Sequence, residues 1–385
     1  MPLAVYILGL AIFSIGTAEL MVAGMTSTLS EAFGITVGEV GHLISYYAFG
    51  VMLGGPVLTY FFLKFKVPYR KVLLLLLTLY VVAQGLSAFV SSYSVLVFIR
   101  IFTGVLCAGC LSLSLATSMA MVSPEKRPRA ASVVIGGFMI SNVFGVPLAT
   151  IIDQRWGWQI TFGLVAVLVF ICLLALKRLL PTITSSGGEL KMEDELKAFK
   201  NAAYWKACLT SCLILGASFA AFSYFVPVLV DVTGFSMKDI PFILMIFGLS
   251  NIVGNMITGR LAHAHSLAIM VVGLTILSAS LLVMALFAEY KSIAIISIIL
   301  IGLTGVPMNP AMMARIVSVA HPGPMVNSVH TSIINIGLGG GSYLGGVAIV
   351  SGYGLSSPMW IGFILAILAL ASITPYLRRN KQGWD

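Results

Sequence analysis

The sequence predicts an all-α membrane protein with twelve transmembrane helices in two six-helix bundles and both termini in the cytoplasm. Of its 385 residues, 59% are hydrophobic and only 9% are charged, whereas a soluble domain carries roughly 25% charged residues. Long apolar runs recur along the whole chain, and an exterior this apolar is stable only in lipid. One long polar segment divides the runs into six and six. These observations exclude a soluble helical protein.

The apolar runs are long enough to cross a bilayer, which requires about 20 mostly apolar residues. The first run is too long for a signal-peptide core and no A-x-A site follows it, so we expect it to remain as the first span. With boundaries set by polar and turn-forming residues, the spans are predicted near 4–26, 40–62, 71–91, 94–121, 131–152, 158–179, 205–230, 238–261, 266–287, 292–317, 325–350 and 357–377.

The positions of Lys and Arg predict the orientation. If the N-terminus is cytoplasmic, 18 of the 22 basic residues, Arg315 included, fall on the cytoplasmic side. Only Arg155, Lys238 and Lys291 fall outside, and Arg100 lies within a span. Cytoplasmic loops of membrane proteins carry such an excess of basic residues. A basic cytoplasmic face also suits anionic lipid, so the net charge of +9 requires no nucleic-acid partner.

The longest hydrophilic segment runs from Pro181 to about Ala203 and predicts the domain organisation. We expect a first bundle at 1–180, a cytoplasmic linker at 181–203 and a second bundle at 204–385. The second part of the linker has the pattern of an amphipathic surface helix. The halves are weakly similar, with Thr-Gly-Val at 103–105 and again at 304–306. Related halves are typical of transporters whose substrate site lies between two rocking bundles.

Four motifs resemble those of a known family. They are Gly16-Thr17-Ala18-Glu19 in the first span, Arg100-Ile101-Phe102-Thr103-Gly104 in the fourth, Gly136 through Asn142 to Gly145 and Pro147 in the fifth, and Asn309-Pro310 in the tenth. With them the chain resembles the major facilitator superfamily, specifically its twelve-span drug:proton antiporters and their arabinose-efflux-like and purine-efflux-like branch. The resemblance covers essentially the full length. It implies a monomeric, multi-pass transporter of a bacterial cytoplasmic (inner) membrane.

One loop departs from the family pattern. Between spans 2 and 3 the family usually has G-x-L-x-D-R-x-G-R-[RK], whereas residues 60–71 are YFFLKFKVPYRK. The basic end is kept, but the Asp and the Gly residues are absent. A cytoplasmic gate that depends on that Asp is therefore not expected here.

Ionisable side chains inside a bilayer are costly and mark functional sites. Glu19 in span 1, Arg100 in span 4 and His42 at the start of span 2 are expected at neighbouring depths on the extracellular side. We interpret them as proton-coupling residues, because protonation would neutralise Glu19 and release Arg100 or a cationic substrate. The alternatives are a static Glu19–Arg100 ion pair, a structural Arg100 bound to Glu19 or to backbone carbonyls, and an interfacial His42.

Amide and aromatic side chains within the spans suit a flat, polar, weakly charged ligand such as a nucleobase or a drug. His330, in the inner half of span 11, is either a cavity ligand and second proton site or a histidine used in helix packing. Gln84, Asn255, Tyr47 and Tyr224 are further candidates of the same kind. The predicted substrate-binding residues are Tyr46, Asn142, Phe222, Phe225, Asn251, Asn309, His330 and Asn335.

Small residues recur at helical spacing in spans 5 and 11, where they allow close helix packing. The resemblance implies that Gly136, Gly145, Gly337 and Gly341 meet partners in the other half, so that the two bundles can rock, and that Pro147 limits leak. The alternative for all of them is ordinary helix packing.

The sequence contains no G-x-x-x-x-G-K-[ST] loop for a nucleotide, so we expect neither an enzyme nor an ATP-driven pump. Cys208 and Cys212 share a helix face but have no His or carboxylate nearby, and no metal or cofactor is predicted. The expected function is proton-coupled export of small organic molecules such as drugs, purine nucleosides or bases, or sugar-like compounds. The alternative is an uncoupled facilitator or importer of a small polar metabolite.

Overall fold

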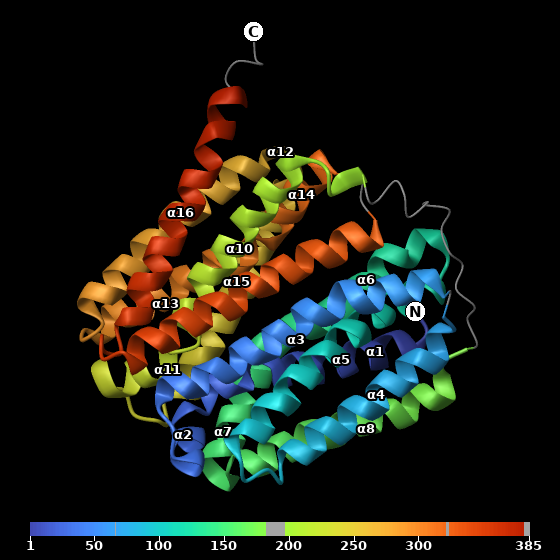
Figure 1. The fold of residues 1–385 in the computed structure, drawn as a ribbon, viewed down its shortest axis with the longest axis horizontal. Coiled ribbons are helices and arrows are strands. Elements are labelled where there is room, and N and C mark those ends of the chain that lie inside the picture. Colours follow the sequence, from blue (N-terminus) through green and yellow to red (C-terminus); the bar gives the residue numbers. More distant parts are fainter. Residues whose placement is uncertain (66, 182–196, 321–322, 381–385) are drawn as a thin grey trace. The chain divides into compact units, whose positions relative to one another are not determined.

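The computed structural model describes residues 1–65, 67–181, 197–320 and 323–380, and within these ranges it contains helices and no strand. Twelve helices are long and apolar enough to cross a membrane, which confirms the predicted number of spans (Figure 1). The altered loop at 60–71 is described except for Lys66. Residues 182–196 hold most of the expected amphipathic linker helix and lie outside the described residues.

The described residues within Met1–Ile35 and Tyr46–Glu189 form one compact unit, and those within Thr36–Ser45 and Leu190–Asp385 form a second. The helices of the N-terminal half are α1 (Leu3–Leu20), η1 (Met21–Gly24), α2 (Thr26–Phe33), α3 (Val37–Lys64), α4 (Tyr69–Ser87), α5 (Tyr93–Ala120), η2 (Pro124–Lys126), α6 (Arg127–Ile140), η3 (Ser141–Gly145), α7 (Val146–Trp156) and α8 (Trp158–Leu179). The fifth span consists of η2, α6, the π-helical η3 and α7.

The C-terminal half follows the linker. Its helices are α10 (Ala202–Phe222), α11 (Phe225–Pro227), η4 (Val228–Val232), α12 (Ile240–Phe287), α13 (Lys291–Thr304), η5 (Val306–Met308), α14 (Asn309–Val319), α15 (Pro324–Val350) and α16 (Ser357–Asn380). Spans 8 and 9 were expected as separate helices, and the two spans are found at Ile240–Ala262 and Ala264–Phe287. The label α12 covers both, because they join at a sharp kink where His265 has non-helical backbone angles (φ −134°, ψ 37°).

One helix lies at the centre of each unit. In the first unit α1 is the most buried span and packs against α5, α6 and α8. In the second unit α10 holds the same position and packs against α15 and α16. Both helices are apolar on every face, as expected for a helix with neighbours all round. The first helix of each half is therefore the one around which its unit is built.

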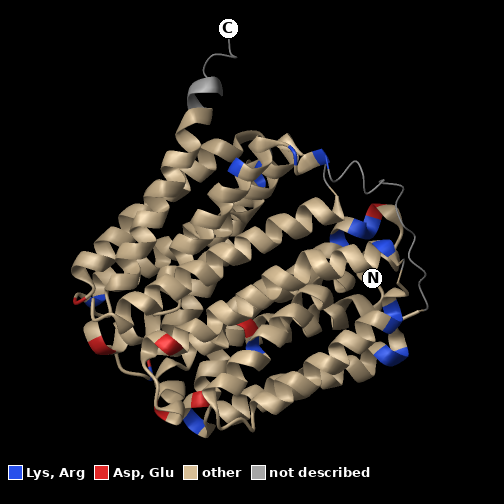
Figure 2. Cartoon of the chain, in the orientation of Figure 1, with Lys and Arg blue, Asp and Glu red and all other residues tan. Residues whose placement is uncertain are grey.

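Large apolar side chains cover the outside of the helices. Phe98 is 70% exposed and Leu53 is 54% exposed. Surfaces of this kind are stable against lipid and not against water. In the first unit, most Lys and Arg residues gather at one end of the helices (Figure 2), which is the arrangement that the predicted orientation requires.

Arg315 corrects one detail of the charge distribution. We expected it among the cytoplasmic loop residues, but it belongs to α14 and is only 5% exposed. Its guanidinium donates to Thr210 Oγ1 at 2.9 Å and lies 4.6 Å from the centre of the Tyr376 ring. Arg315 is therefore a second buried arginine, placed between α10, α14 and α16.

Candidate functional site

The end of α1 forms the first part of the site. The last α-type hydrogen bond of α1 runs from the Met21 N–H to the Thr17 carbonyl, and the chain then tightens into the 3₁₀ turn η1. The carbonyls of the next two residues, Ala18 and Glu19, therefore accept no α-type hydrogen bond within α1. The final carbonyls of a helix need partners from elsewhere and attract cations.

Arg100 supplies those partners. It lies on α5 and is only 1% exposed. Its Nη1 donates to the Ala18 carbonyl at 2.7 Å and its Nη2 to the Glu19 carbonyl at 2.8 Å. These bonds leave from the edge of the planar guanidinium. One of its faces stacks on Tyr47 of α3, with Cζ 4.3 Å from the ring centre, which is a favourable cation–π arrangement. Arg100 therefore joins α1, α3 and α5.

Glu19 lies beside this contact, close enough for the charge of Arg100 to act on its carboxyl. Of the alternatives for Arg100, the structure shows the contact with backbone carbonyls. The Glu19 side chain is only 5% exposed. A buried carboxyl next to a cation can bind and release a proton as its surroundings change.

A buried tyrosine pair extends the site. Tyr47 and Tyr80 of α4 are both fully buried, with their hydroxyl oxygens 3.4 Å apart. Gln84, one turn further along α4, is also buried. Tyr80 was not predicted, because a tyrosine in a span carries no signal that separates a polar contact from packing.

Close packing brings the first and fifth spans together around Glu19. A Cβ added to Gly16 would lie 2.6 Å from Ser141 Oγ, and one added to Gly145 would overlap Thr17. The motif around Glu19 thus packs against η3, which carries Asn142, half-buried. π-Helical turns within α-helices occur often at functional sites. The two motifs singled out in the sequence therefore form one interface.

The same packing recurs in the second unit. A Cβ on Gly337 would overlap the Cys212 carbonyl, and one on Gly341 would overlap the Gly216 carbonyl. The nearest neighbours of Gly145, Gly337 and Gly341 thus lie in their own units. Gly spacing shows that a partner is close but does not say which helix it is. Gly136 has no neighbour within 4 Å of an added Cβ, while Pro147 is buried in the first turn of α7.

Three predicted substrate residues lie together in the second unit. Phe222 and Phe225 pack on Phe247 of α12, with ring centres 5.0 and 5.5 Å away. Asn251 donates from Nδ2 to the Phe247 carbonyl at 2.9 Å. All four residues are buried, so in this conformation they form a packed aromatic cluster with an amide at its edge.

His330 and Asn335 of α15 are also buried. His330 Nε2 lies 3.0 Å from Ser211 Oγ on α10, so here it acts as a hydrogen-bonded packing residue, one of its two predicted roles. Asn335 donates to the Thr331 carbonyl at 2.9 Å. Tyr224, another candidate, is buried and donates to the Ser342 carbonyl at 2.8 Å.

Three predicted residues remain. His42 belongs to the segment Thr36–Ser45, which groups with the second unit, and its ring stacks on Tyr343 with centres 4.4 Å apart. Tyr46 is half-buried on α3. Asn309 is exposed at the start of α14, directly after the helix break between α13 and α14. Discontinuous helices of this kind form the binding sites of many transporters.

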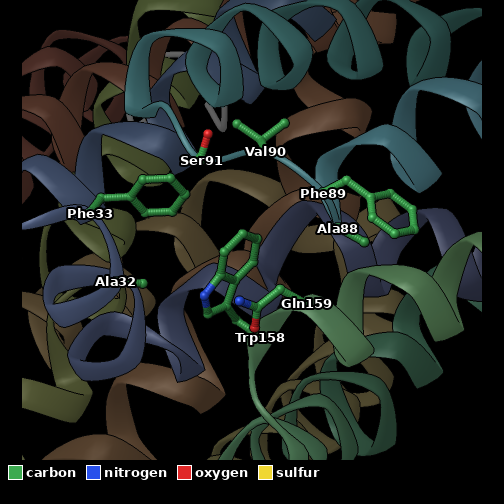
Figure 3. A pocket seen from close by; sticks show the side chains of 8 residues that line it. All are labelled: Ala32, Phe33, Ala88, Phe89, Val90, Ser91, Trp158 and Gln159. Carbon is green, nitrogen blue, oxygen red and sulfur yellow. The ribbon is translucent and has the colours of Figure 1, made fainter.

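One surface pocket of the first unit has a volume of about 310 Å³. Phe33 of α2, Trp158 and Gln159 of α8, and the loop after α4 surround it (Figure 3). A second pocket lies along α12 around Met256 and Arg260. Neither contains a predicted substrate residue, so neither is the candidate site.

Comparison with known proteins identifies relatives along the whole chain. The family model of the Major Facilitator Superfamily matches residues 8–325. A chloramphenicol resistance protein of Streptomyces lividans is 28% identical over 382 residues, covering 98% of this chain and 96% of that protein. The inner membrane transport protein YdhP of Escherichia coli (strain K12) is 28% identical over 376 residues, covering 97% and 96%.

A solved structure shows the same fold. It is that of a bacterial homologue of the human lysosomal transporter Spinster, which superposes with a TM-score of 0.69 over 96% of this chain and 95% of that one. The two sequences are only 14% identical, so the similarity concerns the fold alone.

Proposed function

Because the chain belongs to the Major Facilitator Superfamily, we propose that it is a proton-coupled exporter, an antiporter that exchanges small organic molecules for protons by alternating access. It acts as a monomer in the inner membrane of a bacterium. The transporter class follows from the family, and the coupling ion, the direction and the substrate are the proposal.

One observation carries the coupling. The buried Glu19 carboxyl lies in a membrane span, while the neighbouring Arg100 is engaged by the main chain of α1. An ionised carboxyl is costly in a low-dielectric site, and binding a proton removes that cost. Because the guanidinium of Arg100 already donates to two carbonyls of α1, Arg100 keeps partners when Glu19 binds a proton.

The proposed cycle places the proton and the substrate in competition. Glu19 binds a proton from the extracellular side, which favours release of the substrate outward and return to the inward-open state. In the inward-open state the proton leaves to the cytoplasm, and the ionised carboxyl favours substrate binding. Arg100 holds the end of α1, so that the carboxyl keeps its position on α1 during the cycle. A ligand can shift such an equilibrium only through its different affinity for the two states.

The substrate class rests on accessible residues and on one relative. Asn142, Tyr46 and Asn309 are half-buried or exposed, whereas the other five predicted residues are buried. Amide and aromatic groups suit a flat, polar compound. The name of the Streptomyces lividans relative points to chloramphenicol, which makes that drug the first probe, followed by purines and sugars.

The experiment has two stages. Thermal unfolding of the purified protein with chloramphenicol, purines and sugars first identifies a ligand by the rise in Tm. Proteoliposomes with an acidic lumen then take up the radiolabelled ligand. We expect accumulation above equilibrium in the wild type, and downhill exchange without accumulation in Glu19→Gln. If Glu19→Gln accumulates the ligand as well as the wild type does, Glu19 is not the coupling residue.

The second candidate function, an uncoupled facilitator, is separated by the same vesicles. A facilitator equilibrates its substrate at one rate whether or not a pH gradient is present. Wild-type accumulation that collapses when a protonophore dissipates the gradient excludes it.

A further inference from the structure

Asp153 is a second buried carboxylic acid that the proposed cycle does not use. It lies on α7 near the predicted extracellular end of the fifth span and is only 3% exposed. In the described part of the chain, Glu19 and Asp153 are the two buried acids. Sequence reasoning missed Asp153 because the predicted span ended at residue 152, one residue before it.

The contacts of Thr28 on α2 indicate where a proton lies. Thr28 Oγ1 is 2.8 Å from Asp153 Oδ2 and 3.0 Å from the Met25 carbonyl oxygen. A threonine hydroxyl carries one hydrogen, so with an ionised Asp153 these two contacts share a single hydrogen. If Asp153 is protonated, its O–H donates to Thr28 Oγ1, and Thr28 donates to Met25. Threonine in a helix commonly bonds a carbonyl of the preceding turn.

The surroundings of Asp153 also favour the neutral acid. Oδ1 is buried without a hydrogen-bond partner in the structure. Asp153 lies in the last turn of α7 and its own carbonyl accepts from the Gly157 N–H, so the carboxyl sits at the negative end of a helix dipole. No Lys, Arg or His of the described residues forms an ion pair with it.

Few ionisable groups face Asp153 from the elements packed around it. On α7 itself Arg155 is exposed, and on α2 Glu31 is exposed. η1 and η3 carry no ionisable residue. The ionisable groups of the packed helices α1 and α8 are Tyr6, Glu19, Cys172, Lys177 and Arg178. Lys177 and Arg178 lie in the last turn of α8, at the opposite end from Trp158, where α8 follows α7.

The packing of the first span against the fifth gives the order of the two acids. Going outward, Gly9 meets Gly137, Gly145 meets Thr17, Gly24 meets Thr150 and Thr28 meets Asp153. Residue numbers rise in the same direction in the first and in the fifth span along this interface. Glu19 lies between the second and third of these contacts, and Asp153 lies at the fourth.

We propose that Asp153 is a second proton-binding carboxyl of the first unit, placed between the extracellular side and Glu19, where it takes up protons before they reach Glu19. Its use in transport rests on the proposed proton coupling, but its proton binding does not. The simpler role, an anchor that ties α2 to α7, requires only a hydrogen-bond acceptor and is met equally by an ionised carboxylate.

Infrared spectroscopy of the full chain in phosphatidylcholine vesicles tests this inference without a substrate. The carbonyl stretch of protonated carboxyl groups is measured at about pH 5.5, where exposed Asp and Glu are still ionised. We expect Asp153→Asn to lose one component of this absorption, since asparagine keeps the bond to Thr28 and removes the acid. Thr28→Val, which keeps the acid and removes its partner, should shift that component.

The outcomes separate the two proposals. If Asp153→Asn has the same protonated-carboxyl absorption as the wild type, Asp153 is ionised and the inference is overturned. Glu19→Gln is measured alongside. Loss of a component in Asp153→Asn but not in Glu19→Gln supports the inference and removes the support for coupling through Glu19. Size-exclusion chromatography of each variant verifies that it is folded.

Discussion

The place of the Arg100 side chain depends on the backbone geometry at the end of α1. Its guanidinium is buried because α1 changes from α to 3₁₀ geometry and leaves two carbonyls unpaired at the place that Arg100 reaches. The sequence identified Glu19 and Arg100, because ionisable residues are rare in apolar spans. It left their relation open, because the change of helix type at Leu20 has no sequence signal such as Pro or a capping residue.

The two-nitrogen contact of the Arg100 guanidinium with α1 predicts that even a substitution that keeps the charge lowers the stability of the protein. A lysine keeps the charge but loses the planar two-nitrogen geometry and much of the stacking on Tyr47. Hydrogen bonds to charged groups contribute about 1.5–3 kcal/mol each. We expect Arg100→Lys to lower Tm by several degrees and Arg100→Gln to lower it further, measured by thermal unfolding in detergent.

An unchanged Tm of Arg100→Lys would contradict this prediction. A Tm of Arg100→Lys equal to that of the wild type would mean that only the charge matters, and the bidentate contact with α1 would lose its assigned importance. Lys206→Gln, at an exposed position that is predicted to be cytoplasmic, serves as the control for loss of a positive charge.

At the scale of elements, α1 and α10 are the central helices because small residues let a fifth or eleventh span approach them closely. The glycine spacing in spans 5 and 11 was visible in the sequence. Their partner helices were not, because spacing along one helix carries no information about the helix opposite.

Adjacent glycines of α15 give a matched test of this packing. A Cβ at position 341 overlaps the Gly216 carbonyl, whereas at position 340 it has no neighbour within 4 Å. Overpacking costs about 1–3 kcal/mol, and Ala in place of Gly within a helix gains about 0.5–1 kcal/mol. We therefore expect Gly341→Ala to lower Tm and Gly340→Ala to leave it equal or slightly higher.

The same comparison is available in the first unit. Gly145→Ala overlaps Thr17, while Gly136→Ala meets open space. If both members of either pair change Tm equally, the close contacts with α1 and α10 do not determine stability. A fall in Tm for the two buried positions only would support the arrangement of both units around their first helix.

At the scale of the whole molecule, hydrophobicity and charge predicted twelve spans and their orientation. The number of spans follows from the length and hydrophobicity of the apolar runs, because the bilayer selects for both. It can therefore be predicted without knowledge of the tertiary contacts. The departure at 60–71 from the family loop leaves the orientation unaffected, because its basic residues are kept.

Reporter fusions test the predicted orientation. Alkaline phosphatase is active only outside the cytoplasm, and green fluorescent protein fluoresces when it folds inside. We expect active phosphatase when it is fused after Trp156 and fluorescence when the reporter is fused to the C-terminus. Phosphatase activity at the C-terminus would contradict the assignment of cytoplasmic and extracellular ends, and with it the placement of Asp153 on the outer side of Glu19.

The central claim is that Glu19 exchanges a proton for substrate, and substrate-induced proton release tests it most directly. The ligand identified by thermal unfolding is added to purified protein in a weakly buffered solution with a pH indicator. We expect the wild type to release protons on binding, in an amount that falls as the pH rises and Glu19 is already ionised. Glu19→Gln should bind the ligand without release. Equal proton release from the wild type and Glu19→Gln would contradict the account.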